Sequence, residues 1–516
     1  MKKLNIIFIF ELILFFLIVS GLIPRSFANV LALVLIIYAL FASVENSTIL
    51  FLRSIPFFLA LPLTSSFDNF NTWRVMSIAI FLKWWFQKYS IRTFLSITPR
   101  LSAETKILAG LLIMALLSIL PAGDKIMAVK RVIYFLNLSL IGIVAYDLAN
   151  RNTGILRNLI KNTAVPTIIV AIVGLGQVVS TYFMDIYQFM RIWGENVQCN
   201  QFGNQWCDIA VNVGNTWFAY FGEQLSLRTF SLFPDSHSYP IFMLLGLPAI
   251  FAISLKNKIA RYIAEPGRKI KNLFQTRSGL HILWAPLVYL MLILSGTRGI
   301  WAGSIGVILF GLIVIYFLKD SRRKIFMYLA SYISIFFLLF FVAFPIFASP
   351  QFLVSKGDNL LLQKRVRSII DFGETSNAQR IEIWKKTTDS IIKHPILGIG
   401  IGNYPIVLSQ DLKLAKAGSS AHNLYLHVAA EMGIPALILA IWLMLKILFN
   451  AFKKYASSDD PFLIVFYGAS LLYFPWVLLY LLTDVAVFDE RAFLMLAITA
   501  GILIKKYHVP QSSGNN

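Results

Sequence analysis

A single arginine, Arg380, interrupts the apolar face of the helix predicted for residues 376–394. Ser376 and Gln379 match the capping box that starts many helices, and Pro395 follows the end of the segment. At about 100° of rotation per residue, Arg380 shares its face with apolar neighbours. These neighbours are Ile383, Trp384, Thr387 and Ile391, whereas Glu382, Lys385, Lys386, Asp389 and Lys393 occupy the opposite face.

A charged guanidinium on an apolar face must bind an anion, reach water or pair with a carboxylate. Its planar fork of N–H groups matches two phosphate oxygens at once. We therefore select Arg380 as a candidate ligand for an anionic head group attached to a lipid. A salt bridge to another loop, or contact with ordinary phospholipid, is the alternative.

A second candidate lies in the segment SSAHNLYLHVAAEMGIPALILAIWL, where His422 and Asn423 directly precede a long apolar run. Histidine titrates near neutral pH and can accept a proton from a hydroxyl group. On a helix, Tyr425 would lie about 60° from His422 and could support it, whereas His427 would lie about 140° away. His422 is a candidate general base, and Asn423 lies beside it at the outer end of the predicted span. A structural histidine is the alternative.

Two further arginines stand at the ends of predicted spans. Arg298 belongs to a tight turn, residues 296–299, between two apolar segments, and Arg228 precedes the sequence FPDSH. Asp235 or Ser236 could cap the helix that follows, and a capped helix start beside an arginine favours anion binding. Head-group anchoring of Arg298 and a simple loop before the helix at Arg228 are the alternatives.

The elements that must position these residues are membrane helices. Of the 516 residues, 58% are hydrophobic and only 14% are charged, against about 25% charged in soluble domains. Runs long enough to cross a bilayer recur along the chain, and backbone inside lipid must be helical. The runs are 5–23, 27–44, 47–64, 73–88, 106–121, 132–149, 163–183, 237–255, 280–295, 299–318, 325–347, 423–449, 461–483 and 490–505. We predict an all-α polytopic membrane protein with roughly 12–14 transmembrane helices and a large extracytoplasmic loop containing amphipathic helices.

The net charge of +21 does not indicate nucleic-acid binding, because the lysines and arginines flank the apolar runs. Their distribution places both termini inside and two long segments, 184–236 and 348–421, outside. The first outer segment holds Cys199 and Cys207, which form either a disulfide or two free thiols.

The predicted organisation has four parts. Residues 1–236 form an N-terminal transmembrane bundle with an outer loop near 184–236, and residues 237–449 form a core that includes the long outer loop 348–421. Residues 450–508 form a C-terminal transmembrane hairpin, and residues 509–516 a disordered tail. The glycines of LGIGIGNY, at 398, 400 and 402, indicate a close-approach turn, because their spacing does not match a dinucleotide fingerprint.

The ordered set of motifs resembles the O-antigen ligase and O-antigen polymerase superfamily of bacterial membrane glycosyltransferases. The resemblance covers about residues 280–448 and rests on SGTRG at 295–299, Arg380-x3-Trp384, HPILGIGIGNY at 394–404 and HNLYL followed by EMGIP at 422–435. The stretch RTFSLFPD from Arg228 resembles the family's preceding arginine motif but departs from it at Phe230-Ser231 and Pro234-Asp235. The N-terminal 220 residues match only as a helical membrane bundle.

The resemblance implies transfer of a glycan from an undecaprenyl-diphosphate carrier to an acceptor sugar or a lipid-linked glycan. It implies a multi-pass protein of the bacterial cytoplasmic membrane, with the active site on the extracytoplasmic side and membrane lipids around it, and no metal or other cofactor. Arg380 and Arg228 would stabilise the departing diphosphate and His422 would act on the acceptor hydroxyl. Arg298, Asn423, Tyr425 and Trp384 would bind substrate. Direct attack would invert the anomeric carbon.

Three alternatives remain open from the sequence. Within the family, the chain could be a ligase or a polymerase, because no residue encodes the acceptor. A secondary transporter would use ionisable residues near the bilayer centre, for which Glu11 and Lys83 are the main candidates. A non-catalytic scaffold of envelope assembly is the third.

Overall fold

The computed structural model describes residues 2–64, 70–88, 103–204, 206–207, 216–221, 224–265, 280–353, 375–410 and 419–504. These residues are almost entirely helical, as the composition predicts. The described strands form two short antiparallel hairpins. Strand β1 (Ala60–Leu61) pairs with β2 (Phe70–Asn71), and β3 (Phe218–Phe221) pairs with β4 (Gln224–Leu227).

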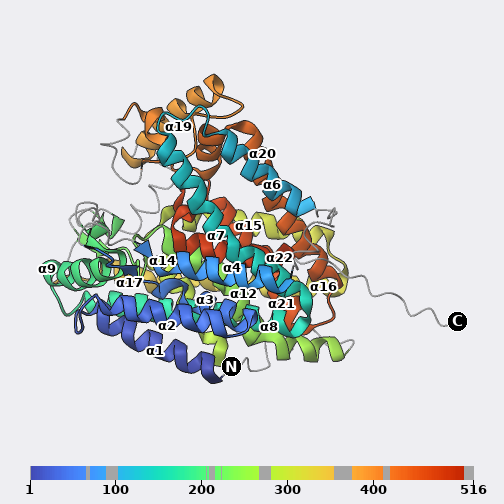
Figure 1. Cartoon of the computed structure of the whole chain (residues 1–516). Coiled ribbons are helices and arrows are strands. Elements are labelled where there is room, and N and C mark those ends of the chain that lie inside the picture. Colours follow the sequence, from blue (N-terminus) through green and yellow to red (C-terminus); the bar gives the residue numbers. More distant parts are fainter. Residues whose placement is uncertain are drawn as a thin grey trace.

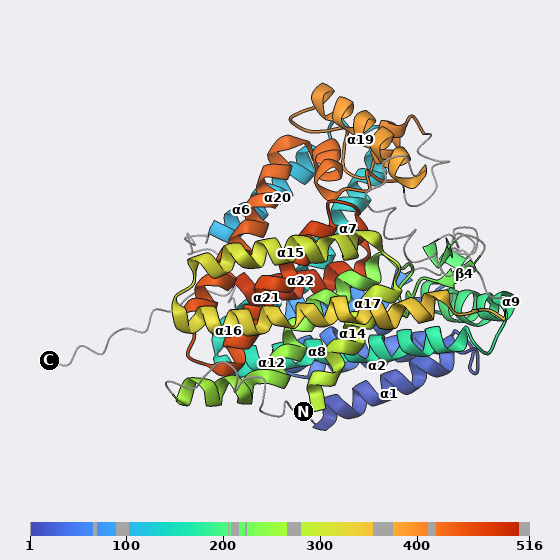
Figure 2. The same ribbon diagram turned by 180° about the vertical axis from the view of Figure 1, so that it is seen from behind.

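Long helices of the bundle run side by side in the views of Figures 1 and 2. The N-terminal ones are α1 (Lys2–Val19), α2 (Phe27–Phe41), α3 (Val44–Ser54), α4 (Thr72–Lys88), α6 (Ala103–Leu117), α7 (Lys125–Arg151) and α8 (Thr153–Ser180). The later ones are α12 (Ser238–Ala264), α14 (Trp284–Leu294), α15 (Arg298–Phe317), α16 (Asp320–Ser331), α17 (Ile333–Ala348), α20 (Leu424–Ser457), α21 (Pro461–Tyr480) and α22 (Glu490–Ile504). Each of the fourteen predicted spans overlaps a helix of this set.

Seven helices within the described residues are long and apolar enough to cross a membrane. They are α7, α8, α12, α15, the joined pair α16–α17, α20 and α21. Helices α12 and α21 are almost wholly buried and pack against each other at the centre of the bundle. The outer helices α15 and α20 expose large apolar side chains, such as Phe317 and Trp442, which is typical of surfaces that face lipid.

The predicted span 47–64 is wrong over its second half. Helix α3 ends at Ser54, and residues 55–57 form a 3₁₀ turn before strand β1. Pro56 lies in that turn and Pro62 follows the strand, and proline disfavours a continuous helix because it lacks the N–H donor and crowds the preceding turn. Helix α3 itself is buried by its neighbours, with Ser47, Thr48 and Ser54 bonded to backbone carbonyls.

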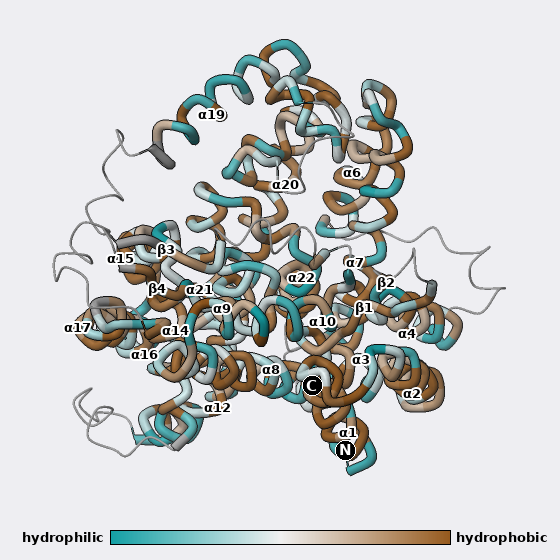
Figure 3. Tube along the Cα trace, turned by 90° about the vertical axis from the view of Figure 1, so that its left-hand side faces the viewer, coloured by the Kyte–Doolittle hydropathy of each residue, from teal (hydrophilic) through white to brown (hydrophobic). Residues whose placement is uncertain are grey.

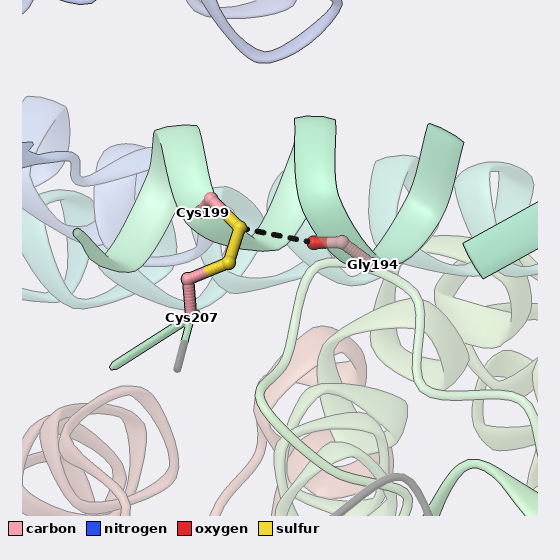
Figure 4. Close-up of a disulfide and its surroundings, with 3 residues drawn as sticks. All are labelled: Gly194, Cys199 and Cys207. Atoms are coloured by element: carbon pink, nitrogen blue, oxygen red, sulfur yellow. Dashed lines mark hydrogen bonds between the residues drawn. A yellow bond between two sulfur atoms is a disulfide. The ribbon is translucent and has the colours of Figure 1, made fainter. Parts of the chain in front are cut away.

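The segment 184–236 forms short elements packed at one end of the bundle. It contains α9 (Ile186–Phe189), the π-helical stretch η2 (Met190–Cys199), α10 (Asn200–Phe202) and the β3–β4 hairpin. Cys199 and Cys207 form a disulfide, which settles the alternative between paired and free thiols (Figure 4). The Sγ atom of Cys199 also lies 3.7 Å from the carbonyl oxygen of Gly194, although a disulfide sulfur has no hydrogen to donate.

Helix α19 (Thr375–Lys393) lies across the directions of the bundle helices, as the end-on view in Figure 3 shows. It packs on the beginning of α20 and on the 3₁₀ turn η5 (Tyr404–Leu408). The start of α20 in turn contacts the end of α21, where the Leu424 N–H donates to the Leu481 carbonyl at 2.9 Å. Helix α19 therefore belongs to the same end of the bundle as the α21–α22 connection. The predicted tail 509–516 lies outside the described residues.

Candidate active site

Helix α19 has the two faces that its sequence predicts. The side chains of Arg380, Ile383, Trp384 and Ile391 are half-buried and Thr387 is buried, whereas the five charged residues of the opposite face are exposed. The helix begins at Thr375, and the predicted capping side chain of Ser376 lies outside the described side chains. Arg380 is thus held on the packed face, and it forms no hydrogen bond or ion pair with any residue that the structure describes.

Two hydrogen bonds fix α19, one against the segment that carries His422 and one against the turn η5. The indole Nε1–H of Trp384 donates to the carbonyl of Ala421 at 2.9 Å. One turn further on, the Thr387 hydroxyl lies 2.7 Å from the Tyr404 hydroxyl. Trp384 therefore acts on the backbone directly before His422. Arg380, one turn earlier on the helix, is close enough for its charge to act on His422 and on Asp484.

His422 lies just before α20 and has an uncommon backbone conformation, with φ of +47°. A left-handed conformation is costly for a residue with a side chain and is often found at functional sites. Its imidazole is half-buried, and its Nδ1 atom is buried without a hydrogen-bond partner among the described residues. Burial lowers the pKa of His422, and the cation of Arg380 lowers this pKa further, whereas the carboxylate of Asp484 opposes both. The ring is therefore neutral near pH 7.

Asn423 and Tyr425, which follow His422 in the sequence, form hydrogen bonds that start helix α20 and attach it to α21. The Oδ1 atom of Asn423 caps the helix by accepting from the N–H groups of Tyr425 and Leu426, at 3.0 and 3.1 Å. The Tyr425 hydroxyl donates to the carbonyl of Leu478 in α21 at 2.9 Å. Tyr425 is thus bonded to α21, and the expected support of His422 by Tyr425 is not seen. The helical angle does not apply, because His422 precedes the helix.

Arg228 approaches the site from the end of β4. Its guanidinium is buried and lies 3.3 Å from the Ser295 carbonyl, 3.4 Å from the Thr297 hydroxyl and 3.3 Å from Nε2 of His237. Gly296, with φ of +63°, forms the predicted turn, and a Cβ atom there would lie 3.1 Å from Cγ of Arg228. Burial lowers the pKa of Arg228 to about 10, so the side chain stays charged at neutral pH.

Arg298 starts helix α15, directly after that turn, as predicted. Its charge acts on Arg228, so the two guanidinium groups belong to one electrostatic environment. The predicted helix cap at Asp235 is confirmed as well. The Oδ1 atom of Asp235 accepts from the N–H groups of His237 and Ser238 at 2.8 and 2.7 Å and so begins α12.

The structure adds a His–Asp pair that sequence reasoning missed. Nδ1 of His237 lies 2.8 Å from Oδ2 of Asp484, and the Tyr480 hydroxyl lies 3.3 Å from the same nitrogen. Burial alone would raise the pKa of Asp484. The electrostatic interaction and hydrogen bond with His237, together with the nearby side chains of His422 and Arg380, outweigh burial and hold this pKa below its usual range. The FPDSH motif contains His237, but no local pattern connects it with Asp484.

His427 belongs to a different network. Its Nδ1 atom accepts from the Ala421 N–H at 3.4 Å, its Nε2 atom lies 3.4 Å from Glu431, and its ring stacks on Tyr404. His427 thus bonds the N–H of Ala421, the residue whose carbonyl accepts from Trp384. His427 therefore positions the loop, while His422 keeps an unpaired nitrogen.

A break in α20 anchors the glycine-rich loop. Gly433 has φ of +85°, and the helical N–H of Ile434 turns to the carbonyl of Pro395 at 2.8 Å. Pro435 has no N–H, which would leave the carbonyl of Glu431 without its helical donor. The N–H of Gly400 donates to that carbonyl at 3.0 Å. The predicted close approach is confirmed, because a Cβ atom at Gly398 would lie 2.4 Å from the carbonyl carbon of Glu431.

The assembled groups suit a reaction in which an anion develops beside a hydroxyl group. Arg228 and Arg380 supply fixed positive charge, and His422 supplies a neutral base. Preorganised charge in a partly dehydrated site stabilises a developing anion more strongly than water does. The geometry therefore favours transfer chemistry on a substrate that carries an anionic leaving group.

Residues 282–441 match the protein family described as O-antigen ligase, which agrees with the resemblance in the sequence motifs. The match includes Arg298, Arg380 and His422, whereas Arg228, His237 and Asp484 lie outside it. No curated protein matches the chain.

Proposed function

The chain carries an O-antigen ligase family domain at residues 282–441, and from this premise we propose that it is a bacterial membrane glycosyltransferase. The proposed reaction moves a glycan from an undecaprenyl-diphosphate carrier to a hydroxyl group of an acceptor sugar. It takes place on the outer side of the cytoplasmic membrane. The reaction uses membrane-borne substrates and needs no metal, nucleotide or nucleic acid.

The meeting of Arg380 and His422 carries this proposal. They come from different elements, α19 and the start of α20, and the Trp384–Ala421 hydrogen bond holds them together. Neither the Arg380 guanidinium nor Nδ1 of His422 has a hydrogen-bond partner among the described residues. The free guanidinium of Arg380 can donate to a lipid diphosphate, and the free nitrogen of His422 can accept a proton from a sugar hydroxyl.

The reaction follows from these groups. The acceptor hydroxyl gives its proton to His422 while its oxygen attacks the anomeric carbon of the donor sugar. The bond between that carbon and the phosphate oxygen breaks, and the electron pair stays on the diphosphate. Arg228 and Arg380 stabilise this charge, and general-base catalysis contributes a factor of roughly 10²–10⁴ to the rate. Attack opposite the leaving group inverts the anomeric carbon.

The His237–Asp484 pair supports the anion site in this proposal. Asp484 lies 2.8 Å from Nδ1 of His237, and Nε2 of the same ring lies 3.3 Å from the guanidinium of Arg228. Arg228 is then fixed by His237, Thr297 and the Ser295 carbonyl together. A guanidinium that is already oriented loses little entropy when it binds a diphosphate.

Arg298, Trp384, Asn423 and Tyr425 remain proposed substrate contacts by position. Arg298 carries a guanidinium group, as the proposed anion ligands Arg228 and Arg380 do. The described hydrogen bonds of Trp384, Asn423 and Tyr425 instead go to backbone groups near His422 and in α21. A ligase and a polymerase would share this donor site and differ in the acceptor.

The transporter alternative receives less support. One carboxylate oxygen of Glu11 accepts from Ser54 at 2.6 Å, and Nζ of Lys83 donates to the carbonyls of Leu40 and Ala39 at the end of α2. Both midspan residues thus have a local structural partner, although Oε1 of Glu11 is buried without one among the described residues. The groups selected for the reaction, Arg380 and His422, instead lie at one end of the bundle, where a surface reaction would occur.

A reconstituted assay tests the proposal. The purified chain in lipid nanodiscs is given an undecaprenyl-diphosphate glycan with several acceptor sugars and lipid-linked glycans, and product anomers are resolved by NMR. Arg380→Ala and His422→Ala should each lose at least about 100-fold in rate. Arg151→Ala, on an exposed ion pair at the far end of α7, is the matched control. Equal rates in all four proteins would reject the site, and retained configuration would reject direct attack.

A further inference from the structure

A second pair of arginines lies beside the candidate site, on helices α4 and α7. The guanidinium carbon of Arg74 lies 5.8 Å from the ring centroid of Tyr134, and that of Arg131 lies at the same distance from the same ring. Arg74 also lies 5.4 Å from the ring of Trp73, and Arg131 lies 6.0 Å from the ring of Phe135. Tyr134 is therefore flanked by two half-buried cations.

Neither arginine has an ion pair or a side-chain hydrogen bond with a described residue. The Nε atom of Arg74 is buried and has no partner in the part of the chain that the structure describes. The nearby carboxylates have other partners. Glu490 accepts from Asn71 and from the indole of Trp73, each at 2.6 Å, and Asp489 caps helix α22. Glu431, on which the charge of Arg131 acts, accepts from the Tyr404 N–H at 3.2 Å. Stacking on an aromatic ring occupies the face of a guanidinium and leaves its N–H edge available.

This arginine pair adjoins the candidate active site through the connection between α21 and α22, residues 481–489. The Tyr134 hydroxyl donates to the Phe488 carbonyl at 3.2 Å, and the ring of Phe488 lies 5.4 Å from His427. Asp484, the partner of His237, belongs to the same connection. Arg131 also packs against the glycine-rich loop: a Cβ atom added to Gly402 would lie 3.3 Å from the Cβ atom of Arg131.

We propose that Arg74 and Arg131 form a second anion subsite, which binds a phosphate or carboxylate group of the acceptor glycan. The inference rests on the proposed transfer reaction. Two substrates must reach the reacting carbon from different sides, and the donor diphosphate already has Arg228 and Arg380. A separate pair of guanidinium groups, without an ion pair among the described residues and next to the 481–489 connection, suits the second substrate.

Labelling with phenylglyoxal, which modifies free guanidinium groups, tests the subsite on the native chain. The protein is held in nanodiscs of phosphatidylcholine alone, and the rate at each arginine is read by mass spectrometry. Inorganic diphosphate and glucuronate are the two soluble probes. At ten times its Kd, a bound anion should slow labelling of Arg74 and Arg131 about tenfold. Arg151, at the other end of α7, should not change.

Each result decides the inference. No protection by either probe, or equal protection of Arg151, overturns the subsite. Protection that occurs only when anionic phosphatidylglycerol is added to the nanodiscs assigns the pair to a lipid head group and overturns the acceptor assignment. Protection by a soluble probe in phosphatidylcholine supports the inference, and the ratio between diphosphate and glucuronate identifies the acidic group.

A kinetic measurement completes the test. The double variant Arg74→Gln, Arg131→Gln should raise the KM for an acidic acceptor about tenfold or more and leave the KM for the donor unchanged. A rise in the donor KM instead would overturn the assignment to the acceptor. The labelling result does not depend on catalysis. Inactive protein with protected arginines would therefore reject the transfer reaction alone, and active protein without protection would reject the subsite alone.

Discussion

Nδ1 of His237 and Oδ2 of Asp484 lie 2.8 Å apart, although His237 begins α12 and Asp484 follows α21. The pair joins the two central helices of the bundle at the end where Arg228, Arg380 and His422 meet. The carboxylate of Asp484, whose pKa is low, lies near the side chains of His237, His422 and Arg380. In the proposed reaction, it does not contact the reacting atoms. Asp484 is thus a positioning residue in the proposed reaction.

Asp484→Asn should therefore reduce turnover while preserving the fold. The amide keeps the size of the side chain but removes the charge that orients His237 toward Arg228. Hydrogen bonds to charged groups contribute about 1.5–3 kcal/mol, so we expect a loss of roughly 10- to 150-fold in kcat/KM for the donor. Steady-state kinetics in nanodiscs measure it, with Asp459→Asn on an exposed side chain as the control. An unchanged kcat/KM would contradict the role of the pair.

The pH dependence should report His422. A general base must be neutral, and burial lowers the pKa of His422 below 6.5, so the acid limb of the kcat/KM profile should lie below pH 6.5. Arg380→Gln removes a cation that lowers this pKa, and the limb should move to higher pH. Asp484→Asn removes an anion that raises it, and the limb should move to lower pH. Lys385→Gln, on the exposed face of α19, should not move it. Shifts in one common direction would exclude His422 as the titrating group.

Trp384→Phe should loosen α19 without changing the charges of the site. The ring keeps most of its packing, but the hydrogen bond to the Ala421 carbonyl is lost, which costs about 0.5–1.5 kcal/mol. We expect a rise of several-fold in donor KM, because Arg380 is no longer held beside His422. Thr388→Val, on the exposed side of the same helix, is the control. A lower kcat with unchanged KM would argue that Trp384 acts in the chemical step instead.

Gly398→Ala should destabilise the protein strongly. The residue has φ of +66°, and an added Cβ would meet the backbone of Glu431 at 2.4 Å. Strain of this kind costs about 1–3 kcal/mol before the loop shifts. Gly176→Ala in α8, where nothing lies within 4 Å of the added Cβ, should leave the melting temperature unchanged or raise it. Thermal unfolding in detergent compares the two variants, and equal melting temperatures would refute the close approach.

Local patterns predicted the elements of the site well. The two faces of α19, the turn at Gly296, the cap at Asp235 and the helix after Asn423 each depend on residues within a few positions of one another. Such short-range signals fix helix boundaries and faces without knowledge of the fold. The same reasoning assumed a helical angle between His422 and Tyr425 and was wrong there, because His422 lies outside the helix.

Long-range pairs could not be predicted from these patterns. Tyr480 and His237 are separated by 243 residues and meet only because α12 packs against α21. Asp484 follows an apolar run with no motif around it, and Arg74 and Arg131 resemble the many basic residues at the ends of spans. Their importance depends on which side chains the packing leaves unpaired.

The break in α20 has a consequence for how this region could evolve or be redesigned. The carbonyls of Ala430 and Glu431 accept from Ile399 and Gly400, and the N–H of Ile434 donates to Pro395. These three backbone groups of the bend are thus hydrogen-bonded to the loop, as an apolar environment requires. A sequence that straightened the helix would leave the N–H groups of Ile399 and Gly400 without hydrogen-bond acceptors. The loop and the bend should therefore be conserved or transferred to another protein together.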